Sequence, residues 1–248
     1  MKMTVLGPWG GYPKAGEASA GYLFQSEGYN LLIDCGSGVL AQLQYHLSVE
    51  ELDSVIISHY HPDHIADVGV LYHGRLIQSK TKSELPVLPI YGHSHDEAGF
   101  NSLGHEPYTE ARSYTEEDRL ELGPFSITFQ KTKHPVVCFA MRITDGKHTV
   151  VFTADSSYIK EFEVFSAGAD LLISECNLYA DMDGSKMGHM NSTDAATIAS
   201  AANVSTLMLT HLPHFGELSD LLKDAKQYFD GEVVLASTGL VWDSEEEI

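Results

Sequence analysis

Hydrophobic and polar positions along the chain of 248 residues follow two different periods. Short apolar runs rich in β-branched residues predict strands, whereas apolar residues three and four positions apart predict amphipathic helices. The predicted strands cover residues 3–6, 21–25, 31–33, 54–57, 86–91, 118–130, 136–143, 147–153, 171–174, 206–210 and 232–236. The predicted helices cover residues 39–47, 65–77, 157–165, 192–202 and 217–229. Strands that alternate with helices in this way indicate an α/β fold.

The pattern runs through the chain without a linker, an internal repeat or a low-complexity segment, apart from an acidic tail at residues 243–247. We therefore predict a single domain spanning residues 1–248. Residues 92–113 have no clear period, and here we predict a variable loop in which His93 and His95 lie in solvent. Ser192 or Thr193 is predicted to cap the helix that follows.

The stretch Ser58-His59-Tyr60-His61-Pro62-Asp63-His64 carries the strongest candidate chemistry. It follows the apolar run 54–57, and in an extended chain His59 and His61 project to the same side. Pro62 disfavours a helical conformation at His61, so the extended geometry persists to that point. After the bend, Asp63 and His64 can turn toward the same region. Imidazole and carboxylate ligands of this kind suit zinc or a similar divalent ion.

Charge and cysteine content limit the binding partners and the cellular location that we expect for this chain. The formal net charge is −20, with 35 acidic against 15 basic residues, so the surface repels phosphate backbones and no long nucleic acid is expected. The visible basic residues form a thin group: Arg75, Lys80, Lys82, Lys131 and Lys133. Three cysteines without paired spacing argue against a disulfide framework. With no visible secretory signal and no apolar run long enough to span a membrane, we expect a cytoplasmic protein and no membrane partner.

Three further polar residues stand at the ends of predicted strands, where an α/β active site draws its ligands. His134 precedes Pro135 between two strands, Asp155 follows the strand 147–153, and His211 follows the strand 206–210. Taken alone, each fits a capping residue or a hydrogen-bonded core residue. Their joint occurrence, each at a strand end, favours a shared site.

The histidine stretch, together with these strand-end residues in this order, resembles the metallo-β-lactamase superfamily, and most closely its small ribonuclease-Z-like bacterial hydrolases. The resemblance implies a four-layered αβ/βα sandwich with two divalent metal ions, zinc or alternatively manganese. By the same resemblance, His59, His61 and His134 hold one ion, Asp63, His64 and His211 hold the other, and Asp155 bridges the two. It also implies that Asp34 steadies a ligand; the alternative is that Asp34 caps the turn before the helix 39–47.

The same resemblance narrows the reaction. A di-iron flavoprotein of the superfamily carries a glutamate in place of His61, and a class B β-lactamase carries an arginine in place of His64; neither change is present. Two ions with a bridging hydroxide as nucleophile suit hydrolysis. The motif Gly188-His189-Met190-Asn191-Ser192-Thr193 is similar to the histidine motif of ribonuclease Z, where the imidazole reaches the scissile phosphate. Asp63 and His189 are thus the candidate catalytic residues, although His189 also fits a structural histidine at a helix entry.

We predict a dinuclear phosphodiesterase for small or short substrates, such as cyclic nucleotides and short oligonucleotides. A lactone or thioester hydrolase on the same metals and a metal-binding module without catalysis remain alternatives. Processing of the tRNA 3′ end is disfavoured, because the long arm that ribonuclease Z inserts between the positions of His134 and Asp155 is missing here.

Glu175, in the sequence S-E-C-N, is a further candidate for an acidic residue that supports the site. By analogy with relatives, we expect a homodimer.

Overall fold

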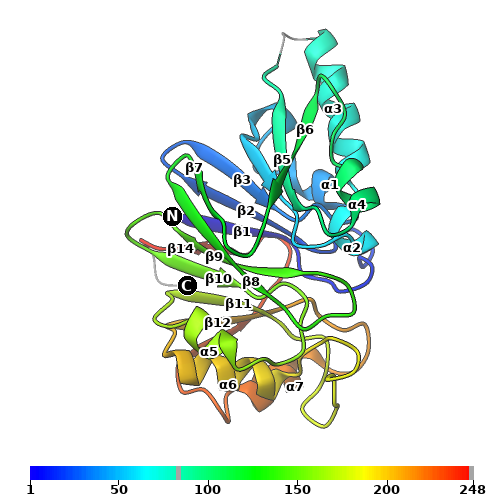
Figure 1. The fold of residues 1–248 in the computed structure, drawn as a ribbon. Helices are drawn as coiled ribbons and strands as arrows, with labels where there is room; N and C mark the ends of the chain where they lie inside the picture. The colour runs from blue at the N-terminus through cyan, green and yellow to red at the C-terminus, as the bar shows by residue number, and fades with distance from the viewer. Residues whose placement is uncertain (82–84, 246–248) are drawn as a thin grey trace. The chain divides into compact units, whose positions relative to one another are not determined.

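The computed structural model describes residues 1–81 and 85–245, whose contacts divide into two compact units. The first unit comprises Met1–Thr115 with the described residues from Ser237 onward, and the second comprises Glu116–Ala236. Each unit contains one mixed β-sheet and its own helices (Figure 1). The single domain predicted from the sequence stays a prediction.

Among the described residues, the sheet of the first unit has seven strands in the order β14-β1-β2-β3-β4-β5-β6. Strands β1 to β3 pair antiparallel and β3 to β6 pair parallel. The strands are β1 (Lys2–Gly7), β2 (Gly21–Ser26), β3 (Tyr29–Ile33), β4 (Ser54–Ile56), β5 (Leu88–His93), β6 (Thr109–Tyr114) and β14 (Val241–Asp243). The helices are α1 (Val39–Leu43), the 3-10 turn η1 (Val49–Glu51), α2 (Pro62–Ile65), α3 (Val68–Thr81) and α4 (Glu97–Asn101).

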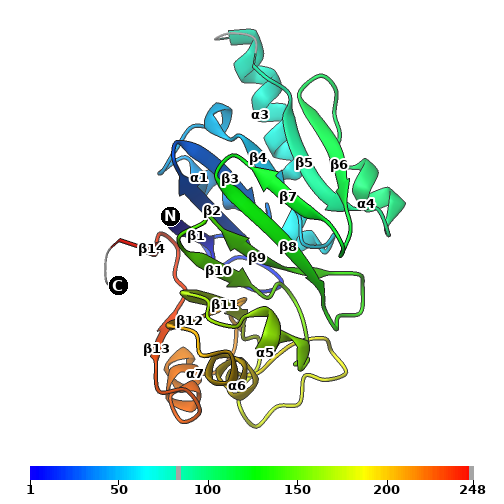
Figure 2. The same cartoon turned by 60° about the vertical axis from the view of Figure 1, so that its left-hand side comes forward.

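The core of the first unit lies between its sheet and its helices. Leu32 and Val55 on the sheet belong to the same buried cluster as Leu43 of α1 and Leu71 of α3. In Figure 2, α3 runs along the strands β5 and β6. Since β3, β4 and β5 are parallel, their carboxyl ends meet at one edge of the sheet, which is where the segments after β3 and β4 begin.

The second unit has the same general plan. Among its described residues, seven strands follow the order β13-β12-β11-β10-β9-β8-β7, with β10 to β13 parallel. The strands are β7 (Arg119–Leu122), β8 (Phe125–Lys131), β9 (Phe139–Thr144), β10 (Thr149–Phe152), β11 (Leu171–Glu175), β12 (Thr206–Thr210) and β13 (Glu232–Leu235). The helices α5 (Glu161–Phe165), α6 (Ser192–Ala202) and α7 (Leu218–Ala225) lie together on one side of this sheet (Figure 1).

Hydrogen bonds explain two differences between the predicted and the observed helices. The predicted helix 65–77 is wrong at its start: the Asp67 amide donates to the Cys35 carbonyl, which ends α2 and separates it from α3. The predicted cap at Ser192 or Thr193 is also wrong. Asn191 is the N-cap of α6, because its backbone is extended and its side chain accepts from the Asp194 amide.

The loop predicted at residues 92–113 is wrong over much of its length, because it contains α4 and the strand β6. His93 lies at the end of β5 and is buried, since β6 pairs with β5 along its full length; His95 is exposed, as predicted. The strand β14 was not predicted either. Lys82 of the basic group and Glu246 and Glu247 of the acidic tail lie outside the described residues.

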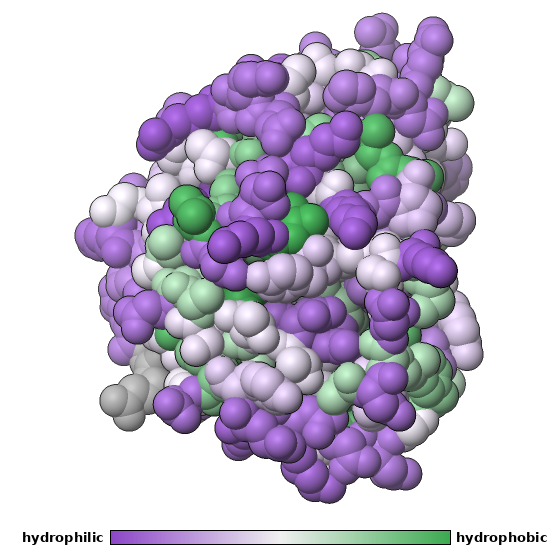
Figure 3. All heavy atoms as spheres, turned by 60° about the horizontal axis from the view of Figure 1, so that its bottom comes forward, coloured by the Kyte–Doolittle hydropathy of each residue, from purple (hydrophilic) through white to green (hydrophobic). Residues whose placement is uncertain are grey.

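The face of the molecule in Figure 3 is mainly hydrophilic, and its hydrophobic residues form small separate groups. The three cysteines, Cys35, Cys138 and Cys176, are buried thiols. Among the residues that the structure describes, no helix combines the length and hydrophobicity needed to cross a membrane.

Candidate metal centre

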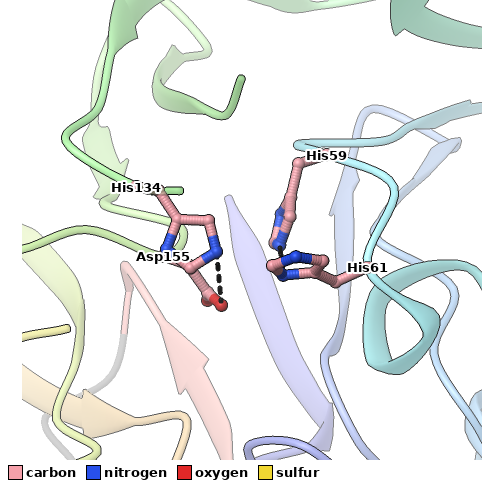
Figure 4. A group of neighbouring side chains, drawn as sticks. All are labelled: His59, His61, His134 and Asp155. Carbon is pink, nitrogen blue, oxygen red and sulfur yellow. Dashed lines mark hydrogen bonds and ion pairs between the residues drawn. The ribbon is translucent and has the colours of Figure 1, made fainter. Parts of the chain in front are cut away.

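The histidine turn of the first unit follows β4 and leads into α2. His61 is the N-cap of α2 with an extended backbone, φ −63° and ψ 146°, and Pro62 occupies the first helical position. This is the extended geometry that the sequence predicts for the residue before a proline. Nε2 of His59 lies 3.1 Å from Nδ1 of His61, so the two imidazoles point toward one another (Figure 4).

The side chain of Asp34 contacts both ends of the histidine turn, Ser58 and His64. Its Oδ2 lies 2.7 Å from Nδ1 of His64, and its two carboxylate oxygens accept hydrogen bonds from the amide and the hydroxyl of Ser58, each at 2.8 Å. Asp34 has a positive φ of 57°, an uncommon conformation for a residue other than glycine. The helix α1 has Gly38 at its N-cap without a side-chain capping bond, so Asp34 does not cap this helix. With Nδ1 of His64 facing the carboxylate, Nε2 is the nitrogen left for a metal ion.

Asp63 is oriented by the glycine-rich loop after β1. The Gly11 amide donates a 2.7 Å hydrogen bond to Oδ2 of Asp63, and that same oxygen lies 3.6 Å from Nε2 of His64. The loop is fixed by the indole of Trp9, which donates to Glu17 and carries the ammonium group of Lys14 at 3.8 Å from its ring. Sequence reasoning missed this contact; its one signal was the cluster of glycines directly after the first strand.

In the second unit, Asp155 lies between two predicted ligands. Its Oδ2 lies 3.4 Å from Nε2 of His211 and 3.9 Å from Nε2 of His134, and Figure 4 shows the latter pair. Nδ1 of His134 is 2.9 Å from the Gly188 carbonyl, which leaves Nε2 facing Asp155. Positive φ values at Ala154 (49°) and at His211 (52°) mark the chain where it leaves β10 and β12. Strained backbone of this kind persists where the surrounding structure holds it, typically at functional sites.

His189 lies beside these residues and rests on a buried carboxylate. Its Nδ1 is 2.9 Å from Oε1 of Glu175, and its ring centroid lies 5.3 Å from those of both His134 and His211. The amides of Ser156 and Met190 donate to the same carboxylate. Burial raises the pKa of Glu175, and the hydrogen bond with His189 opposes this shift. The predicted supporting residue Glu175 therefore contacts His189 directly.

The donor sets of both units fit divalent metal ions. The first unit offers His59, His61, Asp63 and His64. In the second unit, Asp155, His189 and His211 each have a donor atom within 4.8 Å of the others. His189 differs from the predicted ligands in this group, because its Nδ1 contacts Glu175. These are nitrogen and oxygen donors on mostly buried side chains, the chemistry that zinc and similar ions prefer. Buried imidazoles and carboxylates placed this closely are costly to desolvate unless they are paired or bind a cation.

Comparison with known proteins agrees with this chemistry. The family model for the β-lactamase superfamily domain matches residues 29–212. YhfI of Bacillus subtilis strain 168, a probable metallo-hydrolase, is 54% identical over 243 residues, which cover 98% of this chain and all of YhfI. The crystal structure of YhfI, a metallo-β-lactamase fold protein, matches with a TM-score of 0.94 over 97% of this chain and 98% of that chain.

More distant structures share the fold. The short form of human tRNase Z matches with a TM-score of 0.76 and 23% identity, over 98% of this chain and 99% of that chain. A diphosphatase from the PhnP family matches with a TM-score of 0.75 and 18% identity, over 98% and 97% of the two chains. The α/β fold predicted from the sequence, the metallo-β-lactamase αβ/βα sandwich, is confirmed. The chain belongs to the metallo-β-lactamase superfamily.

Proposed function

We propose that the protein is a dinuclear metal-dependent phosphodiesterase that acts on small or short substrates, such as cyclic nucleotides and short oligonucleotides. The proposed ligands are the seven residues predicted from the sequence: His59, His61, Asp63, His64, His134, Asp155 and His211. Zinc suits this set of imidazoles and carboxylates, and manganese is the alternative. When bound, such ions lower the pKa of water and stabilise negative charge on a phosphoryl oxygen.

The observation that carries this proposal is the contact between His189 and Glu175. A fully buried carboxylate accepts from Nδ1 of His189, so the proton on Nδ1 is fixed and Nε2 is the ring atom available to a substrate. The ring is partly exposed, with 21% of the side chain accessible, and it stacks on His211 at an interplanar angle of 18°. When it is also protonated on Nε2, an imidazolium held in this way beside the predicted ligands suits a general acid, which gives the Nε2 proton to the leaving oxygen of a phosphodiester while Nδ1–H stays hydrogen-bonded to Glu175.

A short substrate is favoured over a folded RNA. The interval between His134 and Asp155 contains only β9, β10 and their turn, which offers no arm to hold a tRNA. The net charge of −20 acts in the same direction, because affinity for long nucleic acids depends on phosphate neutralisation. The homodimer and the cytoplasmic location predicted from the sequence are part of this proposal.

The test combines metal content with a panel of chromogenic esters. Protein purified without chelator should contain about two equivalents of zinc or manganese and should hydrolyse bis(4-nitrophenyl) phosphate. The variant His189→Ala should lose about 10²- to 10⁴-fold in kcat on this ester and keep its metal content. His73→Ala, which removes an exposed imidazole on α3, is the control and should behave like the wild type.

The alternatives have distinct outcomes. Fast hydrolysis of a lactone or thioester that survives His189→Ala, with no turnover of phosphodiesters, would assign the site to the other class of hydrolase. Metal binding without hydrolysis of any ester would leave only the binding module. Protein that contains no metal, and that gains no activity when zinc or manganese is added, contradicts the metal centre altogether.

A further inference from the structure

Two loops of the second unit run side by side beyond the candidate metal ligands. One follows β11 and carries Tyr179; the other follows β12, begins with His211 and carries Phe215. Three hydrogen bonds join the segments, since the Cys176 amide donates to the Thr210 carbonyl at 2.8 Å, Asn177 Nδ2 to the His211 carbonyl at 3.0 Å, and the Tyr179 hydroxyl to the Phe215 carbonyl at 2.8 Å. The loop that carries Phe215 is thus fixed to its neighbour at several points.

Phe215 presents an exposed ring from this fixed position. Its exposed fraction is 49%, and its ring centroid lies 5.7 Å from that of Tyr179 at an interplanar angle of 51°. Gly216 follows with a φ of 72°, and a Cβ there would lie 2.5 Å from the Tyr179 ring, so the close approach of Tyr179 requires glycine at this place. A single exposed aromatic residue is common on protein surfaces. Here, however, the backbone that carries it is held by a second aromatic residue.

Charged residues of both signs act on these loops. Asp183 has a lowered pKa, caused first by hydrogen bonds from Ser185 and then by the charges of Lys186 and Lys133. Burial raises the pKa of Tyr179, and the carboxylates of Asp220 and Glu217 act in the same direction. The charge beside the two loops is therefore mixed and does not by itself select a ligand.

The separation between His211 and Phe215 suits a ligand with two different binding groups. Four positions separate His211 from Phe215, so the two Cα atoms are at most about 14 Å apart. One end of the loop thus carries a predicted metal ligand, and the other carries an exposed aromatic ring. A nucleotide has the matching parts, namely a phosphate that binds cations and a flat base that stacks on aromatic side chains.

We propose that Phe215, positioned by Tyr179, is the residue on which the base of a nucleotide substrate stacks while its phosphate binds at the metal centre. This inference rests on the proposed phosphodiesterase function and adds the preference for a nucleoside group. Stacking of one base on one aromatic side chain changes affinity by about 5- to 150-fold. That range sets the expected size of the effect.

The first experiment compares two esters with the same leaving group. Thymidine 5′-(4-nitrophenyl phosphate) carries a base, whereas methyl 4-nitrophenyl phosphate does not. Phe215→Ala should lower kcat/KM about 5- to 150-fold on the thymidine ester and less than about twofold on the methyl ester. Phe215→Trp should retain or increase the preference for the thymidine ester, and Phe215→Leu, which keeps the apolar area without the aromatic face, should lose it.

Two further variants separate recognition from packing. Tyr179→Phe removes the hydroxyl that fixes the Phe215 carbonyl, and it should lose part of the preference for the thymidine ester. Tyr228→Ala is the matched control, because Tyr228 is also an exposed aromatic residue of the second unit, 53% exposed, but it lies beyond the far end of α7. An equal loss on both esters in Phe215→Ala, or no loss on either, overturns the inference.

The second experiment does not depend on catalysis. Calorimetry with zinc-loaded protein should show that thymidine 5′-monophosphate binds more tightly than ribose 5-phosphate, and that Phe215→Ala removes the difference. If neither ester is hydrolysed but this difference is found, the proposed phosphodiesterase function fails and the base site stands. If both esters are hydrolysed and the two monophosphates bind equally, the base site fails and the proposed function stands.

Discussion

Nδ1 of His64 lies 2.7 Å from Oδ2 of Asp34, and both side chains are buried in the first unit. The carboxylate accepts a hydrogen bond from Nδ1–H, which keeps the proton on Nδ1 and leaves the lone pair of Nε2 for a cation. The same carboxylate receives the amide and the hydroxyl of Ser58, the residue directly before the histidine turn. Asp34 therefore fixes both the position of the turn and the tautomer of one of its imidazoles.

Replacing Asp34 tests this arrangement. In Asp34→Asn the side-chain amide can donate to Nδ1 of His64, which favours the tautomer with the proton on Nε2. We expect metal affinity to fall about 10- to 100-fold, measured by competition with a chromophoric chelator, while the circular dichroism spectrum stays unchanged. Asp53→Asn, at an exposed carboxylate that accepts from the Asn30 amide, is the control. Unchanged affinity in Asp34→Asn would show that the tautomer of His64 is immaterial.

Asp155 is predicted to bridge the two ions, and it lies between Nε2 of His134 and Nε2 of His211. In Asp155→Ala both ions should be lost or weakened together, because one carboxylate holds both. We expect elemental analysis to give less than one equivalent of metal and kcat to fall by at least about 10²-fold. Loss of a single equivalent with normal activity would assign Asp155 to one ion alone.

Glu175 is expected to act through His189. In Glu175→Gln the amide can still accept from Nδ1 of His189, but the negative charge is lost, so kcat on a phosphodiester should fall about 10- to 100-fold at constant metal content. Because the two residues act as a unit, the double variant Glu175→Gln/His189→Ala should be no slower than His189→Ala alone. Additive losses in this cycle would mean that Glu175 serves the fold and not the imidazole.

Precursor tRNA should be a poor substrate. The hairpin of β9 and β10 replaces the arm, and no cluster of basic residues compensates among the residues that the structure describes. At physiological salt, a small chromogenic phosphodiester should be hydrolysed while precursor tRNA is cut slowly or not at all. Metal-loaded protein at nanomolar concentration that releases the 3′ trailer from precursor tRNA would refute this expectation.

Much of the fold is predictable because its signals are local. Four strands have short apolar runs rich in β-branched or leucine side chains: β3, β4, β11 and β12. These runs are fully or largely buried in the structure, as the apolar pattern of the sequence predicts. The extended conformation of His61 follows from Pro62, its neighbour in the chain. The predicted strands 21–25 and 31–33 form the antiparallel pair of β2 and β3, and the short turn between them has positive φ at Glu27 and Gly28.

Other elements depend on partners distant in the sequence. The strand β6 has few apolar residues, and it forms because each of its six residues pairs with β5. The amide of Asp67 ends α2 by donating to Cys35, a bond that no helical period reveals. His93, predicted in solvent, is buried for the same reason, since the paired strand β6 closes the edge of β5.

The sequence by itself determined the histidine turn, the imidazole and carboxylate donors that it carries and the order of the strand-end residues, because these follow from residue type and near neighbours. Tertiary structure alone decided what each candidate side chain contacts. The Gly11 amide reaches Asp63 across 52 positions, Asp34 reaches His64 across 30, and Glu175 reaches His189 across 14. Such hydrogen bonds form where the packing of strands and loops brings distant segments together, so no local pattern of the chain encodes them.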